Sequence, residues 1–254
     1  MKARYAPVAL VLFALACNAP DSVAPEHVVT PNASSAVGSR PWAEEIVLDY
    51  RGPNDSHAGL VGPHPTTESD RFSLINGGVR WFTGGTLEYQ ITGTEPVTGA
   101  TAAVIAGEDV WDVLIAARSF VRNDATTQTN PCTDQPNSIR WAPIDGPGGI
   151  AGSTSTCYLA GLKEIVGFDM VLDSQESWGT TGAATVLDVG NTVAHEFGHA
   201  VGLGHVGAPK DGCLTLYKFV IDGEIQKRTP GLGDKLGLAK LYSNANTTAG
   251  SCGS

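Results

Sequence analysis

The sequence predicts one α+β domain that follows an N-terminal segment of different composition. From about residue 78 onward, short stretches typical of strands alternate with glycine, proline and asparagine signals. Longer stretches in the same region carry apolar residues at helical spacing. Before residue 78 the chain is rich in proline, serine and alanine and has no sustained period, which is typical of a linker. Because strand and helix patterns both occur in this one domain, we expect an α+β fold.

Several segments show the alternation or the short apolar run of a strand. They cover residues 87–92, 118–123, 137–144, 148–159 and 164–173. Two shorter strands, at 46–50 and 71–75, fall inside the N-terminal segment, so part of that segment is a candidate for packing on the domain.

Helical spacing appears in three segments. Residues 98–119 place Ala100, Val104 and Trp111 on one face, with Thr98 as the expected cap. A second helix is predicted over 183–203, and a last one over 232–242 closes the domain.

The first residues resemble an export signal. Lys2 and Arg4 precede an apolar run over 6–17, which is too short to span a bilayer but long enough for a signal-peptide core. Small residues near its end suit cleavage after residue 16. The same residues resemble a bacterial lipobox, in which Cys17 would carry a lipid anchor; free secretion is the alternative.

Five cysteines are present, and four remain once Cys17 is set aside. An even number in an exported chain predicts two disulfides. Proximity favours Cys132–Cys157 and Cys213–Cys252, although four cysteines allow two other pairings.

The formal net charge of −10 excludes the basic excess that nucleic-acid binding requires. We therefore expect no nucleic-acid partner, and composition alone does not indicate a substrate.

The stretch HEFGHAVGLGH, residues 195–205, contains three of the six histidines. His195 and His199 are four residues apart, so on a helix they project from one face and can bind one zinc ion. Glu196 beside them is suited to take a proton from water whose pKa zinc lowers to about 7, and to pass it to a leaving amine.

The third ligand is expected from His205. Gly202 can adopt positive φ, end the helix and bring His205 under the metal, which leaves a fourth position open as a catalytic zinc site requires. At this chain's residue frequencies the pattern arises by chance in roughly one sequence in 10⁵. A functional zinc site is therefore the hypothesis that the motif favours.

With these residues, the chain resembles a metzincin zinc metalloprotease and is most similar to the matrixin-like branch, over about residues 80–242. The resemblance implies a zincin fold: a twisted, mostly parallel sheet with an antiparallel edge strand, two long helices, and a small irregular C-terminal subdomain with one helix. Residues 148–154, GGIAGST, are similar to the edge strand that pairs with an extended substrate. The domain organisation is then a signal peptide at 1–16, a linker or pro-segment at 17–77, and a catalytic domain at 78–254.

Further residues match the family pattern. LDSQESW resembles a calcium-binding segment, in which Asp173 and Glu176 would be ligands; two solvated loop carboxylates are the alternative. Asp234 matches an acidic residue of the closing helix. The chain departs from the pattern at Leu216, which stands where metzincins have a methionine beneath the zinc, and Tyr217 follows it as an oxyanion-stabilising residue or as a wall of the cleft.

The leading hypothesis is a zinc-dependent endopeptidase, monomeric, extracellular or attached to the cell envelope, with protein or peptide substrates. The alternative is a zinc-binding surface lipoprotein whose catalysis is impaired, and a zinc hydrolase of non-protein amides is a third reading.

Overall fold

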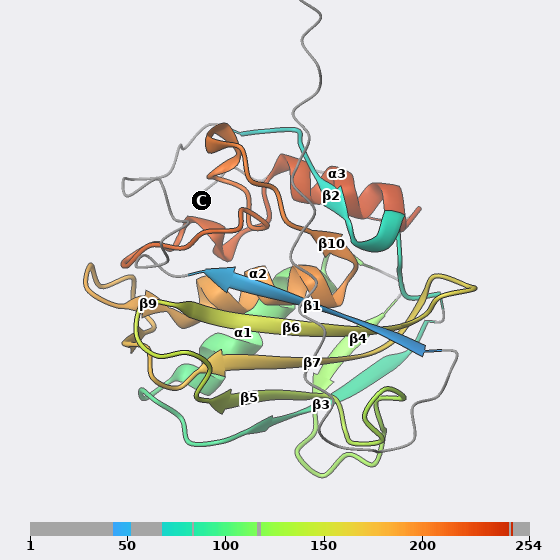
Figure 1. Cartoon of the computed structure of the whole chain (residues 1–254), viewed down its shortest axis with the longest axis horizontal. Helices are drawn as coiled ribbons and strands as arrows, with labels where there is room; N and C mark the ends of the chain where they lie inside the picture. Colours follow the sequence, from blue (N-terminus) through green and yellow to red (C-terminus); the bar gives the residue numbers. More distant parts are fainter. Residues whose placement is uncertain (1–42, 52–67, 83, 116–117, 244, 246–254) are drawn as a thin grey trace, which may run out of the picture. The chain divides into compact units, whose positions relative to one another are not determined.

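The computed structural model describes residues 43–51, 68–82, 84–115, 118–243 and 245. Six strands of these residues form the main sheet, in the order β1-β6-β7-β5-β3-β4 (Figure 1). They span Ala43–Arg51 (β1), Thr86–Thr92 (β3), Ser119–Arg122 (β4), Ser138–Ala142 (β5), Ile150–Leu159 (β6) and Glu164–Asp173 (β7). Strands β7, β5, β3 and β4 are parallel, β6 is antiparallel to β7, and β1 is antiparallel to β6.

This arrangement confirms the mixed, mainly parallel sheet that the sequence predicted. It differs from the prediction at the edge. Strand β6 is antiparallel as expected, but its outer side is covered by β1, which comes from the N-terminal segment.

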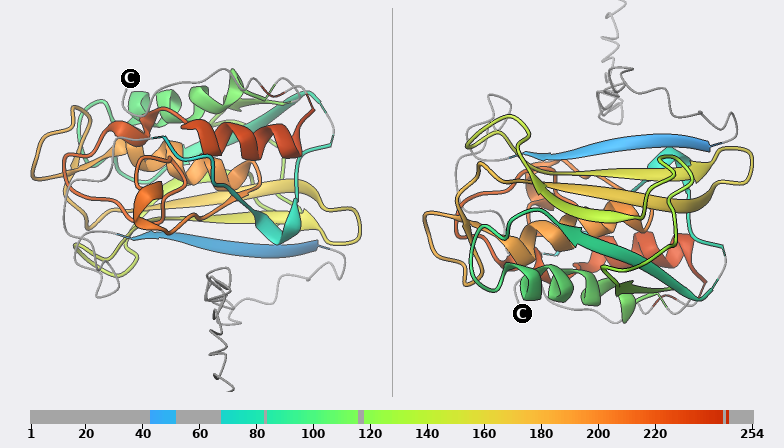
Figure 2. Two further views of the ribbon diagram at one scale, coloured as in Figure 1. Left: turned by 90° about the horizontal axis from the view of Figure 1, so that it is seen from above. Right: turned by 90° about the horizontal axis from the view of Figure 1, so that it is seen from below.

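Two helices, α1 (Ala100–Asp112) and α2 (Val189–Ala200), lie on one face of the sheet (Figure 2). Helix α3 (Leu232–Leu241) follows in the C-terminal part. The remaining elements are short: β2 (Ser73–Leu74), β8 (Trp178–Gly179), β9 (Leu187–Asp188), β10 (Leu203–Gly204), and single 3₁₀ turns at Ile75–Gly77, Pro209–Asp211 and Gln226–Arg228.

Helices α1 and α2 approach closely at Gly107. A Cβ on this residue would lie 3.0 Å from Ala194 N and from Gly190 O, so a larger side chain would push the helices apart. One turn later, Trp111 Nε1 donates to Ala194 O at 2.8 Å. The contact fixes the position of α2, which carries the histidine motif.

Both long helices are shorter than predicted. Helix α1 begins after Gly99, whose φ of 87° and position make it the N-cap in place of Thr98. Helix α2 begins at Val189 because Asp188 caps it: the carboxylate accepts from Asn191 N at 2.9 Å and from Arg228 Nε at 2.8 Å. Residues 183–188, predicted to be helical, instead form a turn and β9.

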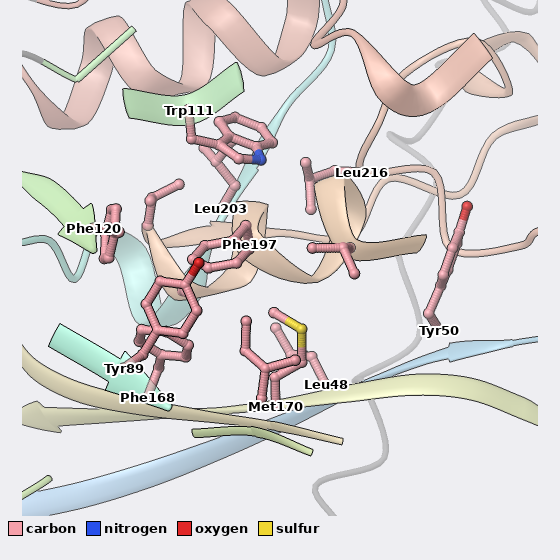
Figure 3. Packing of buried hydrophobic residues seen from close by; sticks show 14 of the residues in the cluster. Leu48, Tyr50, Tyr89, Trp111, Phe120, Phe168, Met170, Phe197, Leu203 and Leu216 are labelled. Carbon is pink, nitrogen blue, oxygen red and sulfur yellow. The ribbon is translucent and has the colours of Figure 1, made fainter. Parts of the chain in front are cut away.

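The face of α2 that points to the sheet carries Phe197, which lies among aromatic rings of the core (Figure 3). Its ring centroid is 5.9 Å from Tyr89, 5.6 Å from Phe120 and 5.4 Å from Phe168. All four side chains are at most 3% exposed. Edge-to-face and tilted aromatic packing of this kind favours one orientation of the helix.

The predicted Cys132–Cys157 disulfide is present and ties the loop before β5 to β6. Cys213 is buried, and its expected partner Cys252 lies outside the described residues, as do residues 1–16 and Cys17. In the described part of the chain no helix is both long and apolar enough to cross a membrane.

Replacing both Cys132 and Cys157 by alanine should lower the free energy of unfolding by about 3 kcal/mol, since the bridge closes a loop with a sequence separation of 25. Urea unfolding followed by circular dichroism measures this change. Mild reduction of the unmodified chain is the control and should shift the midpoint in the same direction. Identical midpoints for the variant and the oxidised parent would contradict the expectation.

Candidate metal centre

Three histidine nitrogens converge on one point. The Nε2 atoms of His195, His199 and His205 are each 3.1 Å from the other two. His195 and His199 come from one face of α2, and His205 comes from the chain that follows β10. Among the described residues this is the one group of three or more potential metal ligands.

The opposite ring nitrogens are held by backbone carbonyls. His195 Nδ1 lies 2.6 Å from Thr215 O and His199 Nδ1 lies 2.8 Å from Leu203 O. A carbonyl only accepts, so each Nδ1 carries the proton and each Nε2 presents a lone pair to the centre. Burial lowers the pKa of both imidazoles well below its ordinary value, and the neighbouring histidines add to this shift. The rings are therefore neutral, as metal ligands must be.

The donor set fits zinc. Three nitrogens at 2.0–2.1 Å from one ion, with tetrahedral angles, stand roughly 3.3 Å apart, close to the 3.1 Å separations in the structure. Three lone pairs directed at one point repel each other unless a cation lies between them.

Gly202 makes the turn that leads to His205, and it has the positive φ that was predicted. Its φ is +99°, and a Cβ on it would lie 2.2 Å from Val79 O. Gly202 N also donates to His199 O at 2.9 Å. A side chain at this position is excluded both by the backbone conformation and by the contact with Val79.

Glu196 is fully buried beside the histidines. Its Oε2 accepts from Thr154 Oγ1 at 2.6 Å, whereas Oε1 has no hydrogen-bond partner among the described residues. Burial raises the pKa of the carboxyl well above its ordinary value, and the hydrogen bond from Thr154 opposes that shift. One oxygen is thus fixed, and the other is available to exchange a proton.

The floor of the site is the turn that contains Leu216. A Cβ on Gly198 would lie 2.5 Å from Leu216 Cδ2, so the leucine packs directly on α2. The Asp234 carboxylate holds the turn by accepting from Thr215 N at 2.8 Å and Leu216 N at 3.2 Å. Burial raises the pKa of Asp234 to about 6, against the effect of these hydrogen bonds.

A buried ion pair lies next to the turn. Lys227 is 0% exposed, and its Nζ is 2.7 Å from Glu224 Oε2 and 2.6 Å from Phe219 O. The same Nζ is 5.4 Å from the ring centroid of Tyr217. Lys227 is therefore part of the core near the site.

The expected calcium ligands lie apart from the histidines, at the end of β7. Asp173 accepts from Gln175 N at 2.8 Å and from Gly146 N at 3.3 Å, and Glu176 accepts from Gly148 N at 2.5 Å. Both carboxylates thus hold the 145–150 loop. Their role as calcium ligands stays a prediction, as do the roles expected for Tyr217.

The family model described as matrixin matches residues 133–243, which include the histidine motif. Matrix metalloproteinase-25 from Homo sapiens is 34% identical over 108 residues, which are 42% of this chain and 18% of the relative. Matrix metalloproteinase-25 from Mus musculus is 33% identical over 106 residues, 41% of this chain and 16% of the relative. This part of the chain is therefore similar to the matrixins. The match spans less than a fifth of the length of these relatives.

The structure adds residues to this matrixin-like site that the sequence analysis did not identify. Thr154 fixes the Glu196 carboxylate, and Gly152 leaves room for it, since a Cβ there would lie 2.7 Å from Glu196 Oε1. Tyr50, from β1, stacks on the His195 ring with centroids 3.6 Å apart. The sequence pattern could not predict these contacts, because each contact joins residues that are about 40 or more positions apart in the chain.

Gly202→Ala should reduce both stability and zinc content. The strained φ and the clash with Val79 O together cost at least about 2 kcal/mol, and the displaced chain would carry His205 away from the other ligands. Unfolding in urea and metal analysis by mass spectrometry measure the two effects. Gly161→Ala is the matched control, since its Cβ would meet nothing within 4 Å. Full zinc content in Gly202→Ala would refute the role assigned to this turn.

Proposed function

We propose that the chain is a zinc-dependent endopeptidase. The observation that carries this proposal is the combination of three convergent histidine nitrogens with a buried carboxylate that keeps one oxygen without a partner among the described residues. A purely structural zinc site has no use for such a carboxylate. The names of the two relatives, matrix metalloproteinases, agree with this reading.

The residues present support hydrolysis of a peptide bond. His195, His199 and His205 would hold zinc, which supplies Lewis acidity and lowers the pKa of a water ligand to about 7. Glu196 takes a proton from the attacking water and delivers it to the nitrogen of the leaving amine. Thr154 orients the carboxylate by its hydrogen bond to Oε2. The carbonyls of Thr215 and Leu203 keep two imidazoles in the tautomer that the metal requires.

Export to the extracellular space or the cell envelope is part of the proposal. It rests on the signal-peptide pattern of residues 1–16 and agrees with the Cys132–Cys157 disulfide, since disulfides persist in oxidising compartments. Cys17 is the candidate for lipid attachment to the membrane. The substrates would be proteins or peptides bound in extended form, and the chain would act as a monomer.

Glu196→Gln should retain one zinc per chain and lower kcat for casein hydrolysis by about 10²–10⁴-fold, because it removes the proton acceptor while keeping the shape of the side chain. Zinc content and hydrolysis, with and without a chelator, are measured on the parent and the variant. Glu164→Gln, the same change on β7 at a partly exposed position, is the control. Zinc without chelator-sensitive hydrolysis in the parent would favour the non-catalytic zinc-binding lipoprotein instead.

Leu216→Met tests whether the missing methionine impairs the site. The two side chains have similar volume, and such exchanges cost less than about 1.5 kcal/mol. We expect zinc content to be unchanged and kcat/KM to change by less than about tenfold. Larger gains in kcat/KM would mean that leucine at this position limits the parent.

A further inference from the structure

The Glu196 carboxylate is held from outside its own helix, by a hydroxyl of strand β6. Thr154 Oγ1 lies 2.6 Å from Glu196 Oε2 and 3.2 Å from the main-chain oxygen of the same residue. Neither oxygen carries a hydrogen when the carboxylate is ionised, so the hydroxyl is the donor. A hydroxyl has one hydrogen, and the shorter distance assigns it to Oε2.

Thr154 is a polar residue in an otherwise apolar row of the sheet. In the register of the strands it lies between Leu48 and Met170, and Ile139 follows Met170 in the same row. Figure 3 shows Leu48 and Met170 extending from the sheet towards α2. All four side chains of the row are at most 5% exposed. Valine has the shape of threonine and would fit this row without a buried hydroxyl, which costs free energy unless it is hydrogen-bonded. The hydroxyl is therefore explained by its bond to Glu196 and not by the packing.

The two oxygens of the carboxylate have different surroundings, and β6 contributes to both. Oε2 accepts from Thr154, whereas Oε1 has no hydrogen-bond partner among the described residues. Gly152 lies two residues before Thr154, on the same face of the strand, and a Cβ on it would lie 2.7 Å from Oε1. Rotation about the last side-chain bond of Glu196 would exchange the two oxygens. The hydrogen bond from Thr154 opposes that rotation.

We propose that Thr154 is a positioning residue for Glu196: its hydroxyl holds Oε2, so that Oε1 is the oxygen that takes the proton from the attacking water. The inference rests on the proposed function, which makes Glu196 the proton acceptor. The proton moves from water to Oε1 and then from Oε1 to the nitrogen of the leaving amine. Thr154 keeps its own hydrogen throughout and exchanges none.

The first experiment compares Thr154→Val and Thr154→Ser in the full, zinc-loaded chain. Thr154→Val keeps the shape and removes the donor, so kcat for hydrolysis of labelled casein should fall about 10–100-fold, with one zinc per chain and KM within twofold of the parent. Thr154→Ser keeps the donor and should have a kcat within threefold of the parent. A loss that serine does not rescue would overturn the inference.

Thr156→Val is the matched control. Thr156 lies on the same face of β6 and is also 0% exposed, but its hydroxyl donates to the main-chain oxygen of His199, at 3.2 Å, and not to the Glu196 side chain. This variant loses a buried hydroxyl of the same strand, and its kcat should stay within threefold of the parent. Equal losses of kcat in Thr154→Val and Thr156→Val would mean that the hydroxyls only attach β6 to α2, which would contradict the proposal.

The second experiment needs no turnover. Urea unfolding of the zinc-saturated chain gives the midpoint for the parent, Thr154→Val, Glu196→Ala and the double variant. Thr154→Val should lower the midpoint by about 0.5 M in the parent, because a buried carboxylate oxygen loses its donor. In the Glu196→Ala chain the same change should lower it by less than half as much, because the acceptor is already gone.

The two experiments separate the inference from the proposed function. If the parent does not hydrolyse casein, the proposed function fails, and non-additive midpoints would still identify Thr154 as the residue that holds the carboxylate. If the parent shows chelator-sensitive hydrolysis but Thr154→Val keeps the parent kcat, the protease stands and the inference fails. Additive midpoints would likewise refute the contact on which the inference is built.

Discussion

The hydrogen bond from His195 Nδ1 to the carbonyl of Thr215, 2.6 Å long, links the three-histidine cluster to the C-terminal part of the chain. The carbonyl is in place only because the turn around it is held, and the turn is held by the Asp234 carboxylate, which accepts from Thr215 N and Leu216 N. Asp234 belongs to the first turn of α3 and also accepts from Gly231 N at 2.9 Å. The closing helix thus sets the orientation of the His195 imidazole through two hydrogen-bonded steps.

These hydrogen bonds also explain why leucine is accommodated at position 216. The turn owes its shape to the Asp234 carboxylate and to backbone groups, none of which involves the side chain at 216. What the side chain must do is fill the space against α2 at Gly198, and leucine does so at 2% exposure. The apolar volume is therefore kept, while the polarisable sulfur is lost.

Parts of the site whose geometry depends on residues only a few positions apart could be predicted from the sequence. The spacing of His195 and His199, the positive φ of Gly202 and the strand at β7 all follow from the residues within a few positions. The start of α2 could not be predicted in this way, because Asp188 is selected as the cap with help from Arg228, 40 residues later. Burial of Lys227 likewise depends on Glu224 and on the carbonyl of Phe219, which periodicity does not reveal.

The pairing of β1 with β6 is the contact that a local reading was least able to find, since it joins residues about 100 positions apart. It nevertheless shapes the site, because it places Tyr50 against the His195 imidazole, with ring centroids 3.6 Å apart. No pattern in the sequence relates position 50 to position 195. The neighbour of this histidine therefore follows from the sheet topology and not from the histidine motif.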